Sequence, residues 1–578
     1  MSGLQILIAV TVLLVSAISF ISYFSGKKSL DSVKNRVVGD GQHGSDRFAT
    51  KKEIEKMYDK IEFYPELWRE KGGFDLKPGI IVGCEKKNGK IYGFADTDDV
   101  HALMIGSSGV GKTSYFLYPN LEYALASGVS FLSTDTKGDI YKNVAFVASK
   151  YYGYKVSVID LRNPIKSDGN NFLELVNYYM DKYIENPNDI ASKAKAEKYA
   201  KIISKNIIYS GEKNTDYGQN SFFYDAAEGL ITSCILLVSE MCDKEERHII
   251  SVFKIVQELL LSEEKSIGKK RKKKTYKEIL DLLPENHKAR WFAGAALSGT
   301  ENTILSVVST ALSRLNAFLD SELETILCRN SAFNAETFAN EKCCMFIVLP
   351  EEDNTKHFMA SLITIQLYRE LLSIADEEGG RLSKKVMFYL DEFGTIPKIQ
   401  SADMMFSASR SRNISIVAVI QSYAQLESNY GVKDAEIIAD NTQLTIFGGF
   451  APTSSSAKKL SDSLGTRTVQ SASLSKGEKT SMNIQMIERK LMTEGELKSL
   501  NRGDFIVMKT FNHPYKFHLM LYMKWGISFP EEYSKITFAG NEIRYANKEK
   551  IENAINVKYH KYPDDIVSKL IDGIRPFK

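Results

Sequence analysis

The chain has 578 residues, which is more than one ordinary hydrophobic core supports and predicts about three to four structural units. Hydrophobic residues make up 43% and charged residues 25%, a globular composition that excludes a wholly disordered or fibrous chain. Lys and Arg number 75 against 72 Asp and Glu, so the net charge of +3 argues neither for nor against a nucleic-acid partner. The six cysteines show no CxxC pair and no histidine at metal-ligand spacing, which indicates reduced core thiols in a cytosolic compartment.

The N-terminal region contains an apolar stretch, residues 4–24, that has no charged side chain. Because about 20 apolar residues cross the hydrocarbon layer as a helix, residues 1–27 are predicted to form a transmembrane anchor. Basic residues at 27, 28, 34 and 36 follow and no charge precedes the stretch, so the positive-inside rule places the remainder in the cytoplasm. The alternative, a cleaved signal peptide, needs a basic n-region and a shorter apolar core. We therefore predict a single-pass protein of the cytoplasmic membrane, with residues 28–75 as linker and membrane-proximal segment.

A glycine-rich motif, GSSGVGKT, matches the phosphate-binding pattern G-x-x-x-x-G-K-[ST]. The apolar run before it predicts a buried strand, and the residues after it have helical spacing. This order lets backbone N–H groups and a helix N-terminus surround phosphates, so ATP and Mg²⁺ are the predicted cofactors. Lys112 is expected to contact the β and γ phosphates, and Thr113 the metal ion. The predicted nucleotide-binding residues are Gly106, Ser107, Ser108, Gly109, Val110, Gly111, Lys112 and Thr113.

A predominantly helical pattern at 178–330 interrupts the predicted nucleotide-binding domain, whose first part covers residues 76–177. Two stretches within it, FFYDAAEGLITSCILLVSEM and SVVSTALSRLNAFL, repeat apolar residues at i, i+3 and i+4. We predict an inserted all-α domain, with a bundle that serves only packing as the alternative. Residues 269–274 are all basic, which is typical either of sequence-independent contact with nucleic-acid phosphates or of a solvated loop.

The second part of the nucleotide-binding domain, predicted at 331–528, contains the sequence KKVMFYLDEFG. Its apolar run ends in Asp391 and Glu392, and in a parallel sheet that position is next to the phosphate loop. Asp391 is therefore predicted to hold the Mg²⁺ shell, and Glu392 to act as the general base that activates water. An ordinary strand end with two acids is the alternative. A kinase or small GTPase would not need the second acid, whereas a hydrolysing motor would.

A further strand, ISIVAVIQS, ends at Gln421, which is predicted to sense the γ-phosphate. Arg410 and Arg412 precede this strand, where they cannot easily reach the phosphates of their own subunit. Either could reach the site of a neighbour and stabilise transition-state charge there. The alternative for both is a solvated surface cation. Residues 529–578 form a polar C-terminal segment without a clear motif.

Several ordered motifs resemble the coupling proteins of type IV secretion, the TraG-like ATPases of conjugation. The resemblance covers residues 43–525 through the segments HGSDRFATKKEI, PGIIVG, HALMIGSSGVGKT, STDTKGDIYKNV, YLDEFG, SRSRNISIVAVIQSYAQLESNYG and ERKLMTEGELKSLNRGDFIVM. It implies that Lys112, Glu392 and Gln421 are catalytic, and that the trans arginine is the one eleven residues before the glutamine, which is Arg410. The implied fold is an α/β P-loop NTPase with a mainly parallel RecA-like sheet and an inserted all-helical domain. To this the apolar stretch at residues 4–24 adds one N-terminal transmembrane helix.

The resemblance also implies a function and partners. The expected protein is a membrane-anchored homo-hexameric ATPase that couples processed single-stranded DNA and its attached relaxase to a type IV secretion channel. Contacts with DNA are expected to be sequence-nonspecific, since no helix-turn-helix or zinc-finger pattern is present. Family members commonly have two membrane spans, whereas this sequence predicts one. A recruitment receptor with little hydrolysis and a DNA-segregation pump are the alternative functions.

Overall fold

A computed structural model of the chain describes Thr11 and residues 14–16, 41–209, 221–259, 275–351, 355–476, 480–534 and 542–559. The predicted anchor therefore lies almost entirely outside the described residues, and the basic run at 269–274 lies wholly outside them. Within the described part, two helices are long and apolar enough to span a membrane, Ser221–Met241 and Phe358–Glu377. Their most apolar windows are 61% and 83% buried in the protein, which is typical of core helices.

The described part of the chain is built around a nine-stranded sheet of order β14-β13-β10-β4-β9-β8-β5-β7-β6. From β10 to β6 all neighbours are parallel, and only β13 and β14 are antiparallel. Parallel strands are buried on both faces, which explains why most of these sequences are continuous apolar runs. In sheet order the strands are Tyr515–His518, Asp504–Lys509, Leu444–Phe447, Ala102–Ile105, Ile414–Ile420, Val386–Leu390, Ser130–Asp135, Cys343–Val348 and Lys155–Asp160.

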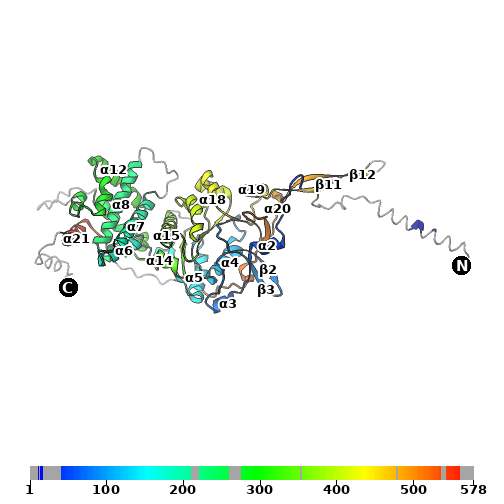
Figure 1. The fold of residues 1–578 in the computed structure, drawn as a ribbon, viewed down its shortest axis with the longest axis horizontal. Helices are drawn as coiled ribbons and strands as arrows, with labels where there is room; N and C mark the ends of the chain where they lie inside the picture. Colours follow the sequence, from blue (N-terminus) through cyan, green and yellow to red (C-terminus); the bar gives the residue numbers. More distant parts are fainter. Residues whose placement is uncertain are drawn as a thin grey trace.

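Helices pack around this sheet, and two small sheets lie outside it (Figure 1). A three-stranded sheet consists of β1 (Asp59–Glu62), β3 (Lys90–Asp96) and β2 (Ile80–Lys87), so the PGIIVG segment starts a strand of this small sheet. β11 (Thr466–Lys476) and β12 (Thr480–Lys490) form a separate hairpin. The surrounding helices are α2 (Lys51–Met57), α3 (Pro65–Glu70), α4 (Tyr118–Ala126), α5 (Asp139–Tyr152), α15 (Phe358–Glu377), α16 (Ala402–Ala408), α17 (Tyr423–Tyr430), α18 (Val432–Asp440), α19 (Ser455–Ser463) and α20 (Glu494–Lys498).

Between β6 and β7 the described residues form helices and loops without a named strand, and this helical segment forms the end of the molecule opposite the β11–β12 hairpin (Figure 1). Its helices start at Glu174 and end at Asn340, a wider span than the sequence pattern at 178–330. They are α6 (Glu174–Glu185), α7 (Ile190–Tyr209), α8 (Ser221–Met241), α9 (Ile249–Glu258), α10 (Tyr276–Leu280), α11 (Lys288–Leu297), α12 (Glu301–Leu315), α13 (Ser321–Leu327) and α14 (Ala335–Asn340).

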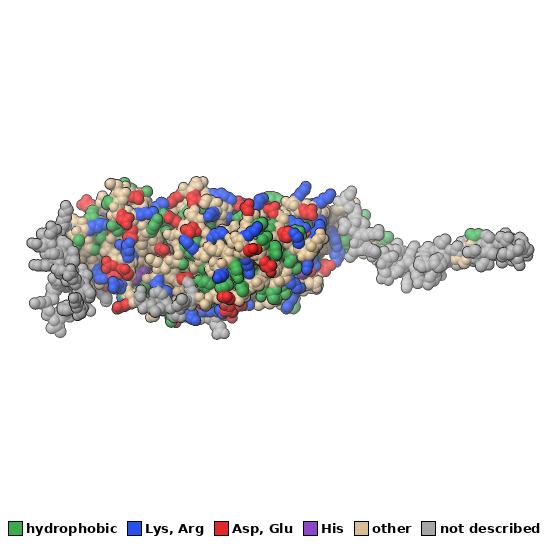
Figure 2. Space-filling model, turned by 90° about the horizontal axis from the view of Figure 1, so that it is seen from below, with side chains coloured by type: hydrophobic (Ala, Val, Ile, Leu, Met, Phe, Trp, Pro, Cys, Tyr) green, Lys and Arg blue, Asp and Glu red, His purple; other side chains and the backbone are tan. Residues whose placement is uncertain are grey.

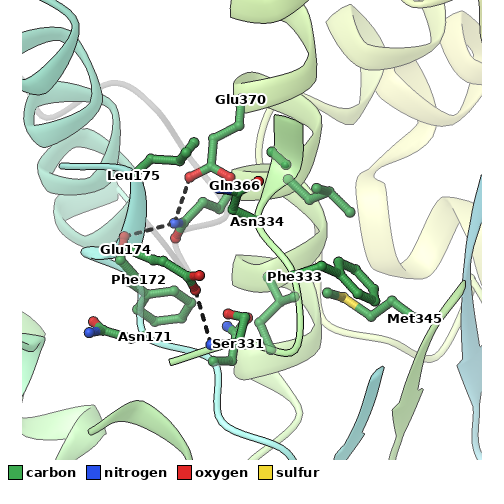
Figure 3. Close-up of a pocket in the computed structure, with 14 residues that line it drawn as sticks. Asn171, Phe172, Glu174, Leu175, Ser331, Phe333, Asn334, Met345, Gln366 and Glu370 are labelled. Carbon is green, nitrogen blue, oxygen red and sulfur yellow. Dashed lines mark hydrogen bonds between the residues drawn. The ribbon is translucent and has the colours of Figure 1, made fainter. Parts of the chain in front are cut away.

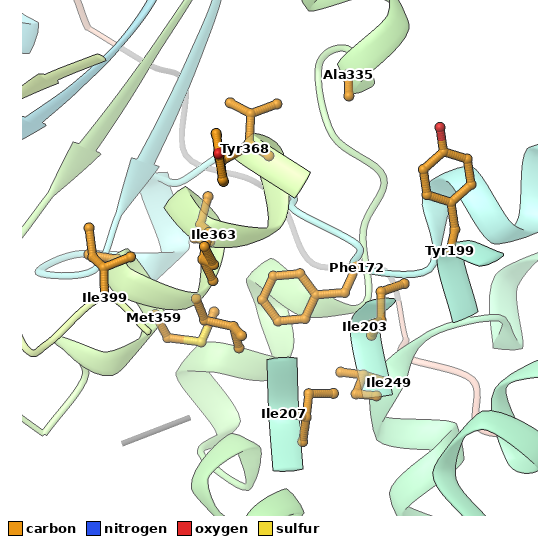
Figure 4. Packing of buried hydrophobic residues seen from close by; sticks show 14 of the residues in the cluster. Phe172, Tyr199, Ile203, Ile207, Ile249, Ala335, Met359, Ile363, Tyr368 and Ile399 are labelled. Carbon is orange, nitrogen blue, oxygen red and sulfur yellow. The ribbon is translucent and has the colours of Figure 1, made fainter. Parts of the chain in front are cut away.

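A continuous hydrophobic core joins these helices to the sheet. Phe172, which follows β6, lies between Ile203 of α7 and Met359 of α15 (Figure 4). All three side chains are almost completely buried. Because α15 also leads directly into β8, the same core contacts both the helical segment and the strand that carries Asp391 and Glu392.

The C-terminal segment, for which the sequence offered no motif, returns to the helical segment. α21 (Lys548–Tyr559) packs on α8, and Lys558 pairs with the buried Glu240 at 2.7 Å. Just before α21, the carbonyl of Arg544 lies 2.9 Å from Nε2 of His248. On the face drawn in Figure 2, Lys and Arg side chains are interspersed with Asp and Glu over the described surface. That face therefore has no extended patch of only positive or only negative side chains.

Candidate active site

The phosphate loop lies between β4 and a helical turn, in the order that the sequence predicts. β4 ends at Ile105, and a π-helical turn (Lys112–Leu117) begins directly after Gly111 and continues into α4. Gly109 and Gly111 have φ values of +79° and +86°, a region that side-chain-bearing residues rarely adopt. At Gly111 a Cβ atom would also lie 2.7 Å from the Tyr115 ring. The glycines are thus needed for a tight loop whose N–H groups precede a helix N-terminus.

Lys112 is a buried cation at the carboxyl edge of the sheet. Its Nζ donates a hydrogen bond to the carbonyl of Gly106 at 2.9 Å, which closes the loop on itself. The same Nζ lies 3.7 Å from Oε1 of Glu392. The loop and the acidic strand end are therefore in direct contact, as the sequence pattern predicts for parallel strands.

Asp391 and Glu392 follow β8 and differ in environment. Asp391 is buried, and burial together with the neighbouring negative charge of Glu392 raises its pKa to about 7. Glu392 is half-buried and has a φ of +52°, a strained value for a non-glycine residue. Thr113, the other predicted metal residue, is half-buried in the π-helical turn, and its side chain has no direct hydrogen bond to Asp391 in the described structure.

Gln421 lies at the end of β9, between the phosphate-loop strand and the acidic strand. Its Nε2 donates to Oε2 of Glu392 at 3.0 Å, so the two oxygens of Glu392 face an amide and an ammonium group. The backbone N–H of Gln421 donates to Oε1 of Gln425 at 3.0 Å. Lys112, Glu392 and Gln421, predicted from three separate motifs, therefore form one connected group.

Sequence reasoning missed a second glycine pair that packs on the phosphate loop. Gly448 and Gly449 follow β10, and the carbonyl of Gly449 accepts from the N–H of Ser107 at 3.1 Å. A Cβ atom at Gly449, whose φ is +64°, would lie 2.3 Å from the Val110 side chain. The Ser107 hydroxyl in turn accepts from the N–H of Ala451 at 2.7 Å. The sequence feature that could have indicated this contact is a Gly-Gly pair directly after an apolar run.

Asp135, from the STDTKGDIYKNV segment, has a structural position at the end of β5. Its carboxylate accepts hydrogen bonds from the backbone N–H groups of Lys137, Gly138 and Tyr141 at 3.1, 2.7 and 2.9 Å. These bonds satisfy free donors at the start of α5. Asp135 therefore fixes the loop beside the acidic strand end.

The two candidate arginines lie at the opposite, amino edge of the sheet, in a short turn before β9 (Arg410–Arg412). Arg412 donates to the carbonyl of Gly380 at 2.8 Å and pairs with Asp376 at 3.1 Å. Arg410 is exposed, and its guanidinium makes no hydrogen bond or ion pair with any described residue. β9 separates it from Gln421 by roughly 20 Å at the usual strand rise. The fold therefore does not bring Arg410 to the phosphate loop of its own chain.

His101 connects this arginine turn to the strand of the phosphate loop. Its Nδ1 accepts from the backbone N–H of Ile416 at 3.0 Å, and its Nε2 lies 3.2 Å from the Ser409 hydroxyl. Because a backbone N–H can only donate, Nδ1 carries no proton and the ring is the neutral Nε2–H tautomer. Burial, reinforced by the positive charge of Arg410, lowers the His101 pKa to about 4. The buried neutral ring thus fixes Ser409, next to Arg410, to the start of β4.

One family profile, described as type IV secretory system conjugative DNA transfer, matches residues 66–553. The chain belongs to this family. Two type IV secretion coupling proteins VirD4 are each 20% identical to it, from Bartonella henselae over 426 residues and from Bartonella quintana over 417 residues. These alignments cover 72% and 71% of the chain. The chain spans only 62% and 60% of the length of these relatives.

Solved structures of the bacterial conjugative coupling protein TrwB have the same fold as this family member. An unbound form is 16% identical, covers 84% of the chain and 96% of TrwB, and has a TM-score of 0.52. The complex of TrwB with ADP and Mg²⁺ is 15% identical, covers 84% and 97%, and has a TM-score of 0.51. At these identities the likeness concerns the fold alone.

A second polar site in this family member lies at the junction of the sheet and the helical segment. It is a cavity of about 40 Å³ between the start of α6, residues 331–335 and α15 (Figure 3). Gln366 donates to the carboxylate of Glu370 at 3.0 Å, and burial raises the Glu370 pKa to about 8. Glu174 accepts from the N–H of Ser331 at 3.0 Å. Glu370 is therefore mainly protonated near neutral pH, which explains how it is tolerated there.

Proposed function

We propose that this chain is a membrane-anchored ATPase that couples processed DNA, with its attached relaxase, to a type IV secretion channel and drives its transfer. The observation that carries the proposal is the connected group of Lys112, Glu392 and Gln421 at the carboxyl ends of adjacent parallel strands. Such an edge is where open α/β sheets bind and convert nucleotides. Membership of the conjugative DNA transfer family supports DNA as the transported cargo.

The residues present fit ATP and Mg²⁺. The loop from Gly106 to Thr113 offers backbone N–H groups and one buried ammonium to phosphates. The Thr113 hydroxyl and the Asp391 carboxylate are the hard oxygen ligands that Mg²⁺ prefers. The pKa of Asp391 is raised by burial beside Glu392, and a divalent cation would favour its ionised form. When bound, the metal neutralises charge that develops on the transferred phosphoryl group.

The chain's own residues would divide the remaining work. Lys112 would leave the Gly106 carbonyl for the phosphates, which also separates it from Glu392. The freed Glu392 carboxylate would accept the proton of the attacking water, as a general base. Gln421 holds Oε2 of Glu392 and so orients that carboxylate. In this proposal, phosphate binding frees the general base, because Lys112 moves away from Glu392 when it contacts the phosphates.

We further propose that Arg410 acts in the site of a neighbouring subunit. It is exposed and unpaired among the described residues, whereas Arg412 is held by Gly380 and Asp376. A contact between the amino edge of one copy and the carboxyl edge of the next is head-to-tail, and such contacts form a ring when the rotation between copies closes. The expected assembly is a homo-hexamer.

The remaining parts of the proposal follow the sequence expectations. Residues 4–24 would anchor the protein in the cytoplasmic membrane by a single span. The helical segment between β6 and β7 would be an inserted domain that faces the cytoplasm and contacts substrate. Contacts to single-stranded DNA would be sequence-nonspecific, and the relaxase and channel components would be protein partners.

The deciding experiment compares the full chain with Glu392→Gln in membranes. We measure ATP binding, ATP turnover with and without single-stranded DNA, and conjugative transfer in cells. A motor should retain binding in Glu392→Gln but lose DNA-stimulated turnover and transfer. The matched control is Glu436→Gln, an exposed residue of α18. Normal transfer by Glu392→Gln would indicate a recruitment receptor and overturn the motor proposal.

A further inference from the structure

The β11–β12 hairpin projects from the end of the molecule opposite the helical segment (Figure 1). Its strands pair without interruption from Thr466 opposite Lys490 to Lys476 opposite Thr480. Ion pairs to neighbouring elements occur at its base, where Arg489 contacts Glu496 and Lys490 contacts Asp462. Farther out, residues 469–473 and 483–487 have no hydrogen bond to any described element outside the hairpin.

The outer part of this hairpin has two chemically different faces. Side chains alternate between faces along each strand, and directly opposite residues share a face. One face carries apolar side chains, and Ile484 and Met486 are 51% and 44% exposed on it. The other face carries hydroxyl and amide groups in its outer part, whereas nearer the base it carries the buried Val469 opposite Ile487, which is 38% exposed. The pairs on the first face are Gln470 with Met486 and Ala472 with Ile484, and those on the second are Ser471 with Gln485 and Ser473 with Asn483.

An amphipathic two-stranded hairpin is more stable when its apolar face is buried against another surface. Isolated hairpins are marginally stable in water, and clustered apolar side chains on a surface mark an interaction site. Within the described residues, no element packs over Ile484 and Met486, since both stay about half exposed. The occupant of this face therefore lies outside the described chain.

The path of the chain indicates which occupant this is. The residues that lead back to the predicted anchor are bonded to the hairpin base: the N–H of Thr468 donates to Gly44 at 3.0 Å, and that of Asp46 to Thr466 at 3.0 Å. An extended hairpin strand of this length reaches roughly 35 Å. The linker between residue 24 and Gly44 spans at most about 70 Å. A membrane that holds residues 4–24 thus lies within reach of the hairpin.

A second exposed apolar group lies near the segment that leads to the N-terminus. Phe511, in the turn between β13 and β14, is fully exposed and has a φ of +67°. The nearby carbonyl of Pro514 accepts from the N–H of Ala49 at 2.8 Å, so this turn also borders the segment that leads to the N-terminus. Phe is among the apolar side chains that surface-bound segments insert at the boundary of the lipid headgroups.

We propose that the apolar face of the β11–β12 hairpin lies against the lipid surface and holds the ATPase body at a fixed orientation to the membrane. The inference rests on the proposed membrane anchor. Ile484 and Met486 contact lipid, while the face with Gln485 and Asn483 stays in water. A single span is a flexible tether, and the hairpin supplies a second, oriented contact.

Site-specific photocrosslinking tests this contact in the full chain. p-Benzoylphenylalanine replaces Ile484 or Met486, and in matched controls it replaces the adjacent Asn483 or Gln485 on the other face. The protein is reconstituted in vesicles of phosphatidylcholine and phosphatidylglycerol that contain an alkyne-tagged lipid, and illuminated. Tagged lipid should attach several-fold more strongly at positions 484 and 486 than at 483 and 485.

Two results would overturn the lipid contact. Equal, low labelling at all four positions means that the apolar face does not meet lipid. Crosslinking from 484 or 486 to a second copy, detected as a covalent dimer without tagged lipid, means that neighbouring subunits cover the face. Retention of the chain in vesicles after an alkaline wash measures the anchor separately, so an anchored but unlabelled chain refutes the hairpin contact alone.

Discussion

The two edges of the nine-stranded sheet differ in how their charged side chains are satisfied. At the carboxyl edge, Lys112, Glu392 and Gln421 contact one another within one chain. At the amino edge, His101 and Ser409 fix the turn, but the Arg410 guanidinium has no partner among the described residues. The charged groups of the first edge are paired within the chain, whereas the second edge has one exposed cation without a partner among the described residues. This difference between the edges supports the proposal that Arg410 acts in the site of a second copy.

The largest expected effect comes from Arg410→Ala. It should lower ATP turnover by roughly 10³-fold, the size of arginine contributions in phosphoryl transfer. Arg412→Ala is the matched control and should stay near the parent rate, because Arg412 is bound to Gly380 and Asp376 of its own chain. Steady-state turnover of the full chain, with protein concentration varied, is the measurement.

A mixing experiment separates action in trans from action within one subunit. Subunits with Arg410→Ala are combined with subunits that carry Lys112→Ala, each inactive alone. A composite site with an intact loop from one copy and Arg410 from the other should recover turnover. If ATP turnover does not recover although mixed rings assemble, Arg410 acts within its own chain. The two edges would then not come from different copies.

A smaller effect is expected from Gln421→Ala at the complete edge. Loss of one hydrogen bond to the Glu392 carboxylate should lower kcat about 10-fold, in line with the energy of bonds to charged groups. Gln421→Glu keeps the shape but places a second negative charge beside Glu392, so it should be slower than Gln421→Ala. If both variants keep the parent kcat and change only KM, Gln421 does not orient the base.

Gly449→Ala probes how tightly the phosphate loop is enclosed. A Cβ atom there would meet Val110 at 2.3 Å, so we expect ATP affinity to fall by about 10-fold as the loop shifts. Gly431→Ala is the control, because its φ is +84° but nothing lies within 4 Å of the added Cβ. Nucleotide titration by calorimetry should therefore separate the two variants. Equal losses would mean that backbone strain alone, and not the contact with Val110, sets the effect.

The smallest and most pH-dependent effect concerns His101. Its folded pKa of about 4 lies below the ordinary value near ~6.5, so the unfolded chain binds the proton more readily. The stability of the parent is therefore complete above pH ~6.5 and falls by up to about 2–3 kcal/mol as the pH drops toward ~4. Arg410 and Lys385 are the cations that face the ring and oppose its protonation.

His101→Gln should start with a lower melting temperature at pH 7.5 but lose less of it on acidification. His248→Gln is the control, because burial also lowers the His248 pKa to about 4 at a site in the helical segment. Both variants should flatten the pH dependence, and His101→Gln alone should also lower ATP turnover at pH 7.5. Unchanged turnover would mean that His101 stabilises the fold without positioning the arginine turn.

Sequence by itself determined the parts of the carboxyl edge that depend on local patterns. The glycines of the phosphate loop, the acids after Leu390 and the glutamine after Ile420 each follow an apolar run. In a parallel sheet the carboxyl ends of such runs meet at one edge, so three motifs distant in the chain could be assigned to one site. The comparisons confirm the predicted family, because local motifs of this kind are what related chains share.

Tertiary structure alone decided what depends on long-range contacts. Residue chemistry did not separate Arg410 from Arg412, and the family resemblance selected Arg410. The structure adds the physical difference, which is a bond from Arg412 to the distant Gly380. The contact of Gly449 with Val110 and the link from His101 to Ser409 likewise join residues hundreds of positions apart. The hairpin with Ile484 was missed because its alternation is irregular and its base pairs with residues near Gly44. Such packing is set by the whole chain's burial and hydrogen bonding, which no local window contains.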